Sequence, residues 1–529
     1  MDSSMRLLVG GDVSPRDRWS RVAIFIVWLA LVLWLAWDHV FWRDEVRAFS
    51  LALSGSNYAQ MLRTVHGEGH PALWYLILRA SHDIFPYREV LPIAGLVIGI
   101  VAMSLVVFFS PFRTIFVAAI IFSAYGAFDF VVMARNYGIS ALVMFTLAAA
   151  YQRVRNSLWF GFILAVLCNT NVPSCLLAAA FLLFRFVELL TETSKPTRRD
   201  WLVFGGNALL AALGAYLCFI TVYPTFNDEA VSRNLGHFGI GTVVRAMADS
   251  EWGFAHLAFD FLPPPFNVVP FNAIILALSC LGFIRRPAAL AASLAGLIAF
   301  KLFFYLVYFS SYRHEILFVV FLLSLYWMIG KGAGGAWRER KWFRHAEFAG
   351  LGVFLILLIV QTGRLLNPVH MQLEGIPDSQ AADVARLLKR PELSGAIVMG
   401  DPDTMLEPLS YYTDNPIWLL RQQRFGRVVP LSLKARHELS MADVLGDAER
   451  LHRLTGRPVV FLSHLQLQDR YEERFPHMIF RDATTLRPTE VRRFLSSTQL
   501  IAKLWGAGSD EEYDVYVYPA SNAPIATGR

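Results

Sequence analysis

Residues 22–41, VAIFIVWLALVLWLAWDHVF, decide the fold because they form an apolar run of the length that crosses a lipid bilayer. A membrane-spanning α-helix needs about 20 predominantly apolar residues. Trp42-Arg43-Asp44-Glu45 follows directly, so a pair of carboxylates lies where the predicted span meets water. The run is too long for the apolar part of a signal peptide, and no small-residue cleavage site follows it. We therefore expect it to remain as an anchor.

The composition is that of a membrane protein with many spans. Of the 529 residues, 55% are hydrophobic and 17% are charged, whereas soluble domains contain about 25% charged residues. The formal net charge is +6, but many Lys and Arg residues fall in short loops between apolar runs. The positive-inside rule explains that distribution better than a nucleic-acid partner does. We expect membrane lipids, and no nucleic acid, among the partners.

The chain changes character near residue 369. Before it, the candidate spans are 22–41, 71–85, 91–109, 114–133, 137–152, 158–168, 172–187, 201–223, 261–283, 288–309, 313–330 and 346–363. After it, apolar runs shrink to strand length and alternate with helix-like patterns; the strand candidates are 396–400, 458–463 and 513–519, and the helix candidates are 378–390, 441–455 and 487–497. This predicts a polytopic α-helical membrane bundle of about 11–12 spans over 22–368. A soluble α/β domain is expected over 369–529, and residues 1–21 are expected to be a cytoplasmic N-terminus.

The basic loops predict the topology. Four clusters are expected in the cytoplasm, at 153–155, 195–199, 285–286 and 331–344. Two candidate spans separate each successive pair of clusters. Parity then places 110–113 with the N-terminus and assigns the following to the other face: 134–137, 169–171, 224–260, 310–313 and the C-terminal domain. The run 71–85 has no room to cross completely, so we interpret it as a short, dipping or surface-lying segment; the alternative count makes it a true span.

On this topology residues 42–90 form the first external loop. Apolar residues recur there at helical spacing, first at Val46, Phe49 and Leu53 and then at Tyr58, Met61, Leu62 and Val65. Two short amphipathic helices on the membrane surface are predicted. Arg47 and Arg63 would lie at headgroup height, where they can hold a lipid phosphate. The alternative is that both helices only cap the bundle.

Other polar groups are expected on the same face as Asp44 and Glu45. They are His66, Glu68 and His70 in HGEGHP, Arg88, Arg135 and Tyr137 in ARNYG, and Arg313 and His314 in SYRHE. If the bundle is compact, basic groups from three external turns reach one carboxylate pair. The alternatives are an ordinary interfacial acid pair, a helix-end cation at Arg135 and an interfacial anchor at Arg313-His314. The segment 224–260 is either a lid over this site or a solvated loop.

The two histidines of HGEGH suggest a zinc site, but the order of the residues does not favour one. Metalloprotease helices carry H-E-x-x-H, and here Gly67 and Gly69 weaken any helix that would align both rings. The glycines instead let the backbone approach a ligand, and Pro71 is expected to start the next helix. We assign no metal ligands and leave a divalent metal possible as the only cofactor. The sequence has no phosphate-loop motif, no Rossmann glycine pattern before a helix and no nucleophile-elbow motif, so nucleotide-driven chemistry and serine hydrolysis have no support.

The first span followed by Asp44-Glu45, two juxtamembrane helices and then Gly69-His70-Pro71 resembles the GT-C superfamily of polyprenyl-phosphate-dependent glycosyltransferases. Protein O-mannosyltransferases and lipid A aminoarabinose transferases are the members it is most similar to. The similarity covers about residues 20–330 and departs from the commonest pattern at Ala72, where many members have a second proline.

The resemblance implies an inverting transfer of a sugar from a polyprenyl phosphate to a glycolipid, polysaccharide or protein acceptor on the extracytoplasmic face. Asp44 would be the base, and Glu45 would orient it or the acceptor. Binding of the donor phosphate and substrate would fall to Arg47, Arg63, His66, Glu68, His70, Arg88, Arg135, Tyr137, Arg313 and His314. The expected location is the inner membrane of a bacterium, with the C-terminal domain outside the cytoplasm. The competing hypotheses are a transporter or lipid flippase, and a non-catalytic scaffold.

Overall fold

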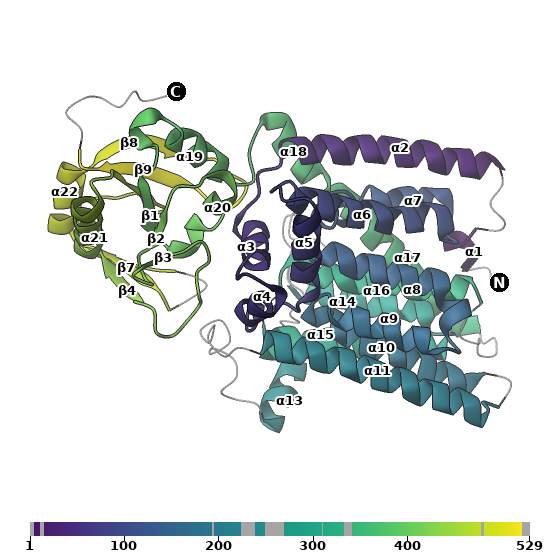
Figure 1. The fold of residues 1–529 in the computed structure, drawn as a ribbon. Helices are drawn as coiled ribbons and strands as arrows, with labels where there is room; N and C mark the ends of the chain where they lie inside the picture. The colour runs from purple at the N-terminus through teal and green to yellow at the C-terminus, as the bar shows by residue number, and fades with distance from the viewer. Residues whose placement is uncertain are drawn as a thin grey trace. The chain divides into compact units, whose positions relative to one another are not determined.

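The computed structural model describes residues 5–10, 15–192, 195–223, 239–248, 269–308, 310–332, 341–477 and 481–520. It divides into two compact units (Figure 1). The helical unit comprises Met1–Trp37, Glu68–Tyr223 and Asn234–His370, and the α/β unit comprises Asp38–Gly67, Pro224–Arg233 and Met371–Arg529. Most of the predicted lid, 224–260, lies outside the described residues.

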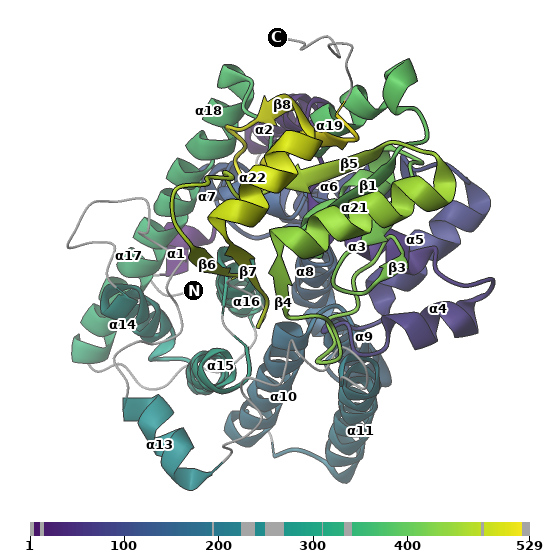
Figure 2. The same cartoon turned by 90° about the vertical axis from the view of Figure 1, so that its left-hand side faces the viewer.

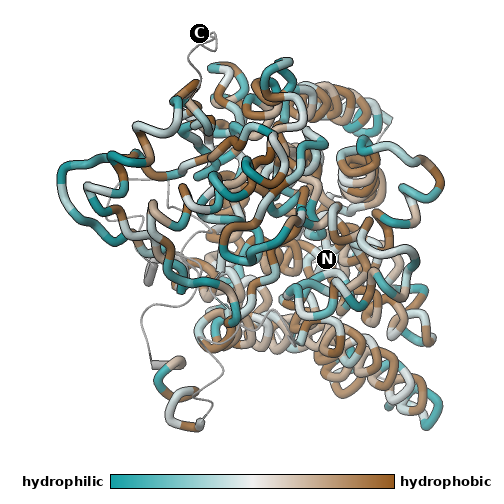
Figure 3. Tube along the Cα trace, turned by 60° about the vertical axis from the view of Figure 1, so that its left-hand side comes forward, coloured by the Kyte–Doolittle hydropathy of each residue, from teal (hydrophilic) through white to brown (hydrophobic). Residues whose placement is uncertain are grey.

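The helical unit consists of long apolar helices, which are predominantly brown in Figure 3. Its elements are α1 (Met5–Leu8), α2 (Pro15–Trp37), α5 (Leu73–Ile84), α6 (Val90–Phe109), α7 (Thr114–Ile121), the π-helix η1 (Tyr125–Asp129), α8 (Tyr137–Val154), α9 (Leu158–Cys168), α10 (Val172–Thr191), α11 (Arg198–Val222), α13 (Ile240–Ala248), α14 (Val269–Cys280), η3 (Leu281–Phe283), α15 (Pro287–Leu306), α16 (Tyr312–Gly330), α17 (Lys341–Arg364) and α18 (Leu366–Glu374).

Seven helical stretches of the described residues are long and apolar enough to cross a membrane. They are α2, α6, α10, α11, α15, α16 and the stretch Lys341–Glu374. The protein is thus a multi-pass membrane protein, as the composition predicts. Other candidate spans form shorter helices: the run 114–133 breaks where Ser123 Oγ accepts the Gly126 N–H at 3.0 Å and the π-helix begins. The 12 residues of α5 agree with the short segment expected at 71–85.

One end of the helical bundle brings together loops that parity assigns to one face. Arg21 Nη1 donates to the carbonyl oxygens of Val107 at 2.8 Å and Ser110 at 3.2 Å. Gln152 Nε2 donates to Lys331 O at 3.2 Å, and a Cβ at Gly330, the last residue of α16, would lie against Val9 and Pro111. The N-terminus and the turns near 110, 153 and 331 therefore share this end.

The opposite end of the same helices holds the turns that parity assigns to the other face. Asn136 Nδ2 donates to Thr170 O at 2.8 Å, and Tyr137 Oη lies 2.8 Å from His314 Nε2. The predicted grouping of the turns 134–137, 169–171 and 310–313 is thus confirmed. Which end faces the cytoplasm stays a prediction.

Small residues let α9 and α11 pack closely. A Cβ at Gly161 would lie 2.6 Å from Asn207 Cα, and one at Gly214 would lie 2.5 Å from Ala165 Cα. The close approach also lets Asn207 Oδ1 accept the Gly161 N–H at 2.8 Å. Van der Waals contact of this kind drives association of helices in lipid, where the hydrophobic effect does not.

The α/β unit contains two sheets and the helices around them. Its elements are α3 (Arg43–Ala52), α4 (Tyr58–Val65), α19 (Ala381–Leu388), η4 (Pro391–Leu393), β1 (Ile397–Asp401), η5 (Asp403–Leu406), α20 (Leu409–Tyr412), β2 (Ile417–Leu419), β3 (Arg424–Phe425), β4 (Glu438–Ser440), α21 (Met441–Thr455), β5 (Val459–Ser463), β6 (Glu473–Pro476), β7 (Ala483–Leu486), α22 (Pro488–Ser497), β8 (Gln499–Leu504) and β9 (Tyr513–Tyr518). The larger sheet has the order β3-β2-β1-β5-β9-β8, and the smaller has the order β4-β7-β6. Strand β1 runs parallel to both β2 and β5.

Alternation along the strands explains why helices cover both faces of the larger sheet. Val398 and Val460 belong to the hydrophobic core with α19 and α20, whereas Ile397 and Phe461 belong to the core with α21 and α22. Successive side chains of a strand point to opposite faces, so two covered faces need two sets of apolar residues. Figure 2 shows α21 and α22 lying over one face. The predicted strands and helices of this domain are confirmed.

Residues 38–67 belong to the α/β unit, whereas the sequence places them in a loop of the membrane domain. Helix α2 ends at Trp37, four residues before the expected end of the span at Phe41. Asp38 and His39 are the polar residues at this point, and neither continues the apolar helix. The chain then runs to α3 and α4, the two helices expected in this loop; their predicted position on the membrane surface stays a prediction.

Candidate functional site

The acid pair opens helix α3. Trp42 precedes the helix in an extended conformation, and the Glu45 carboxylate reaches back to accept the Trp42 N–H at 3.3 Å. Carboxylates in the first turn are favoured because the N-terminal end of a helix carries partial positive charge. The physical chemistry of helix initiation thus places Asp44 and Glu45 side by side on the first turn.

The two carboxylates have different surroundings. Glu45 is fully buried, and both of its oxygens lie 3.1 Å from His39 Nε2. Asp44 is only half-buried. A buried carboxylate whose oxygens are both engaged by a cation is held in place, whereas a half-buried one can meet a ligand. The roles expected from the sequence for Asp44 and Glu45 stay predictions.

His39 bridges two carboxylates. Its Nδ1 lies 2.8 Å from Asp378 Oδ2, on the other side of the ring from Glu45. Burial disfavours the charged ring, but the carboxylates of Glu45 and Asp378 outweigh it and raise the pKa of His39 to about 10. The ring is therefore an imidazolium at neutral pH, with both N–H groups donating. Since the pKa is raised from 6.5, the stability gained from this charge is complete below about pH 6.5 and is lost as the pH rises to about 10.

Arg47, expected to hold a lipid phosphate, instead contacts the C-terminal part of the chain. Its Nη1 forms an ion pair with Glu407 and donates to Val429 O at 2.9 Å. The neighbouring Arg63 is exposed in the last turn of α4, and His66 is half-buried just after that helix. Arg47 therefore binds other groups of the α/β unit, whereas Arg63 is exposed.

The HGEGHP segment contains a sharp turn. Gly67 and Gly69 have φ of +87° and +80°, which side chains with a Cβ rarely adopt. The following helix begins at Leu73 rather than at Pro71. Glu68 and His70 are half-buried; Arg88 is exposed, with its Nε 3.5 Å from Glu89 Oε1. Among the described residues, no group of three or more His, Cys, Asp or Glu side chains is placed to hold a metal.

Arg135, Tyr137 and His314 form one cluster in the helical unit. Arg135 is 8% exposed, and its guanidinium carbon lies 5.6 Å from the centre of the Tyr137 ring. The Ser311 N–H donates to His314 Nδ1 at 3.1 Å, so the ring hydrogen is on Nε2 and is donated to Tyr137 Oη. Tyr137 Oη then accepts this bond. The half-buried Arg313 precedes His314 at the start of α16.

Two of the three predicted turns thus meet in the helical unit. The acid pair, Arg47, Arg63 and His66 belong to the α/β unit, whereas Glu68, His70, Arg88 and the Arg135 cluster belong to the helical unit. The expected convergence of both groups on one site stays a prediction. His39 was missed because it lies at the polar end of an apolar run; the pair Asp38-His39 was the available signal.

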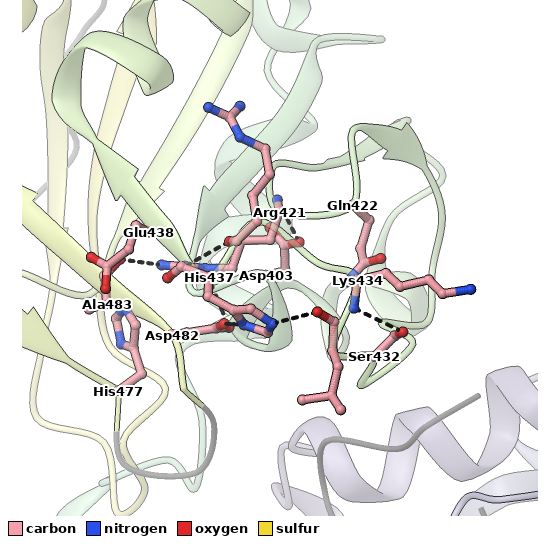
Figure 4. A network of polar contacts seen from close by, with 12 residues as sticks. Asp403, Arg421, Gln422, Ser432, Lys434, His437, Glu438, His477, Asp482 and Ala483 are labelled. Atoms are coloured by element: carbon pink, nitrogen blue, oxygen red, sulfur yellow. Dashed lines mark hydrogen bonds and ion pairs between the residues drawn. The ribbon is translucent and has the colours of Figure 1, made fainter. Parts of the chain in front are cut away.

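A buried ionic network in the α/β unit also escaped the sequence analysis (Figure 4). Arg421 follows β2, and its Nη2 lies 2.7 Å from Oδ1 of Asp401, the last residue of β1. Its backbone N–H donates to Asp403 Oδ2 at 3.0 Å, and its Nε lies 3.5 Å from Asp482 Oδ2. Arg421 also donates to the backbone carbonyl of His437 at 2.7 Å. These contacts join the two sheets of the unit.

The carboxylates of this network ionise differently. Burial opposes ionisation of Asp401, but the Arg421 guanidinium and hydrogen bonds from His477 and Thr484 hold its pKa well below the usual range. Burial, together with the charge of Asp401, raises the pKa of Asp403 to about 8. At neutral pH the network is therefore built on one firmly ionised pair, Asp401 and Arg421.

No family model and no curated protein matches the chain, whereas solved structures of similar fold are found. ArnT from Cupriavidus metallidurans in the apo state aligns with a TM-score of 0.48 and 15% identity, over 95% of this chain and 98% of that chain. ArnT from the same organism bound to undecaprenyl phosphate aligns with a TM-score of 0.42 and 14% identity, over 96% of this chain and 99% of that chain.

Proposed function

We propose that the protein is an integral-membrane glycosyltransferase that moves a sugar from a polyprenyl phosphate to an acceptor hydroxyl or amine. The observation that carries the proposal is the unequal acid pair on α3, directly after the first long apolar helix. One carboxylate is buried on an imidazolium and the other is half-buried. The Gly69-His70-Pro71 segment and its resemblance to the GT-C superfamily supply the reaction class.

The proposed reaction is a single displacement with inversion. Asp44 accepts the proton of the acceptor as the acceptor atom attacks the anomeric carbon of the donor sugar. The bond from that carbon to the phosphate oxygen breaks, and the electron pair leaves with the lipid phosphate. A phosphate needs no proton to leave, so cations that bind it suffice. Adjacent residues on one helix turn do not flank a sugar, as the two carboxylates of a retaining enzyme must.

Arg135, Tyr137 and His314 are proposed to bind the departing phosphate. They combine a guanidinium with a phenol and an imidazole, and charge-assisted hydrogen bonds are about twice as strong as neutral ones. We propose that three further arginines also bind the donor; they are Arg63, Arg88 and Arg313. The site is proposed to lie on the extracytoplasmic face, where lipid-linked donors replace nucleotide sugars.

A panel of polyprenyl-phosphate sugars tests the function. Purified protein in nanodiscs, given each radiolabelled donor and a membrane extract as acceptor, is expected to release polyprenyl phosphate and label the acceptor with at least one donor. Translocation of the intact donor across proteoliposomes without release of polyprenyl phosphate would instead identify a flippase. Failure of every donor, with no labelled acceptor, contradicts the proposal.

Tyr137→Phe tests the proposed phosphate contact. The variant is expected to raise the KM for the donor, because the phenol hydrogen is lost, and to lower stability by about 1 kcal/mol, because His314 loses its acceptor. Donor titration in the transfer assay and thermal unfolding in detergent measure the two effects. Tyr216→Phe on α11 is the matched control, because Tyr216 is 60% exposed. An unchanged KM would remove Tyr137 from the site.

A further inference from the structure

The helix that carries the acid pair is bound to the rest of the α/β unit by three cations, two on the helix and one just before it. His39, Arg43 and Arg47 lie four residues apart, and each forms an ion pair with a carboxylate more than 300 positions away. The partners are Asp378 at 2.8 Å from His39 Nδ1, Asp510 at 3.0 Å from Arg43 Nη1, and Glu407 beside Arg47. Residues four apart share one face of a helix, so Arg43 and Arg47 face the α/β unit together.

Backbone hydrogen bonds add a second set of contacts at the start of α3. The Phe41 N–H donates to Tyr412 Oη at 2.7 Å, and the Arg43 N–H donates to Glu511 Oε1 at 2.8 Å. The first N–H groups of a helix have no partner within it, so an external acceptor fixes where the helix begins. The Phe41 ring also packs edge-on against Tyr411, with ring centres 4.9 Å apart.

All the acidic partners lie at one end of the strands of the larger sheet, where β1 and β5 terminate. Glu407 follows η5 at the carboxyl end of β1, and Asp510 and Glu511 precede β9, whose Asp514 pairs with Ser463 at the carboxyl end of β5. Asp378 lies beside them, because the Ser509 N–H donates to its carbonyl at 3.1 Å. Open α/β sheets generally bind ligands at this end. Here the chain's own helix α3 occupies it.

We infer that the C-terminal part of the α/β unit positions the acid pair, and that His39 is the positioning residue that links this part to Glu45 beside Asp44. The inference rests on the proposed function in that Asp44 is taken as the base. A 10-residue helix is marginal by itself in water, so its direction and rotation depend on tertiary contacts. The clamp, defined as His39, Arg43 and Arg47 with their acidic partners, fixes both and thereby fixes where Asp44 points. The C-terminal part of the chain thus contributes to the rate of transfer without touching the sugar.

Hydrogen exchange and transfer kinetics on the full-length protein test the clamp. His39→Gln removes the charge and one of the two donors, and it is expected to increase amide exchange over residues 43–52. It is also expected to lower kcat by about 100-fold, with little change in the KM for the donor, because small displacements of reacting groups cost rates of that size. Asp378→Asn, which keeps the shape of the partner, is expected to act in the same direction.

Reversing both charges of one ion pair distinguishes loss of the clamp from simple misfolding of a variant. Arg43→Asp and Asp510→Arg are each expected to increase exchange in α3 and lower kcat, and the double variant is expected to recover most of both. The pair suits this exchange because Asp510 is half exposed. Glu438→Arg is the matched control, since Glu438 is an exposed carboxylate that pairs with Arg474 and not with α3.

The outcomes separate the clamp from the proposed function. Unchanged exchange in α3 for His39→Gln, or no recovery in the double variant, overturns the clamp. Increased exchange with an unchanged kcat also overturns it as a positioning device. If the unmodified protein transfers no sugar from any donor, the proposed function fails. The clamp then fails as well if the variants leave amide exchange in α3 unchanged. If the variants alter that exchange, the clamp is retained as a device that orients Asp44 for another reaction.

Discussion

Asp44→Asn is expected to lower the rate of sugar transfer by about 10²–10⁴-fold, the usual contribution of a general base. Asparagine keeps the size of aspartate, and the lost charge in the first turn is worth only about 0.3–1 kcal/mol, so α3 should form as before. The amide cannot accept the proton of the acceptor, and the acceptor must then attack in its protonated form. The loss should therefore fall on kcat, with little change in the KM for the polyprenyl-phosphate donor.

Glu45→Gln gives the informative contrast. Glu45 is buried against His39, so the neutral variant leaves an imidazolium with one of its two carboxylates missing. Removing one partner of a buried ion pair costs about 3–5 kcal/mol. Glu45→Gln should thus lower the thermal unfolding midpoint in detergent, whereas Asp44→Asn should not. Full transfer activity of Asp44→Asn, measured with radiolabelled donor, would remove Asp44 as the base.

Arg421→Met is expected to destabilise the α/β unit by about 3–5 kcal/mol, because it leaves the carboxylate of Asp401 buried without its counter-charge. Asp401 is 4% exposed and Arg421 is 3% exposed, so water cannot replace the lost contacts. The guanidinium also donates to the carbonyl of His437 and to Thr484 Oγ1, and those acceptors lose their donor as well. Methionine fills a similar volume, so packing changes little.

Hydrogen exchange at the amides of β1 and thermal unfolding of the full chain measure this effect. Arg474→Met is the control, since that arginine is 54% exposed in its side chain and surface pairs contribute only about 0–1 kcal/mol. Asp401→Asn combined with Arg421→Met should recover part of the loss, because both charges are then removed together. Equal exchange in β1 for Arg421→Met and Arg474→Met would show that the network does not hold the two sheets together.

Local patterns were enough to predict most of the fold. Apolar runs of span length predicted the long helices, and short apolar runs such as 396–400 and 458–463 predicted β1 and β5. The positions of Arg and Lys in the loops predicted which turns share an end of the bundle. Each of these signals lies within about 20 neighbouring residues, which is the length of one membrane-spanning helix.

The placement of α3 could not be predicted, because it depends on pairs that are distant in the chain. Arg47 and Glu407 are 360 positions apart, and Arg43 and Asp510 are 467 apart. Nothing in the pattern around Arg47 distinguishes a partner carboxylate from a lipid phosphate, since a guanidinium binds both through the same fork of N–H groups. Arg421 could not be predicted for the same reason. Nothing in the residues around it indicates that its guanidinium is buried against a carboxylate.

The contact of Arg21 with the end of α6 sets an order of events during synthesis. The acceptors, Val107 and Ser110, are made 86 and 89 residues after Arg21. At about 5–20 residues per second, the ribosome needs on the order of 4–20 s to reach them. During that interval α2 can reside in the bilayer with its guanidinium at the headgroups, as long cationic side chains allow. Nascent chains arrested before Val107 is made and well after Ser110 is made should therefore differ in how firmly α2 is retained by its neighbours.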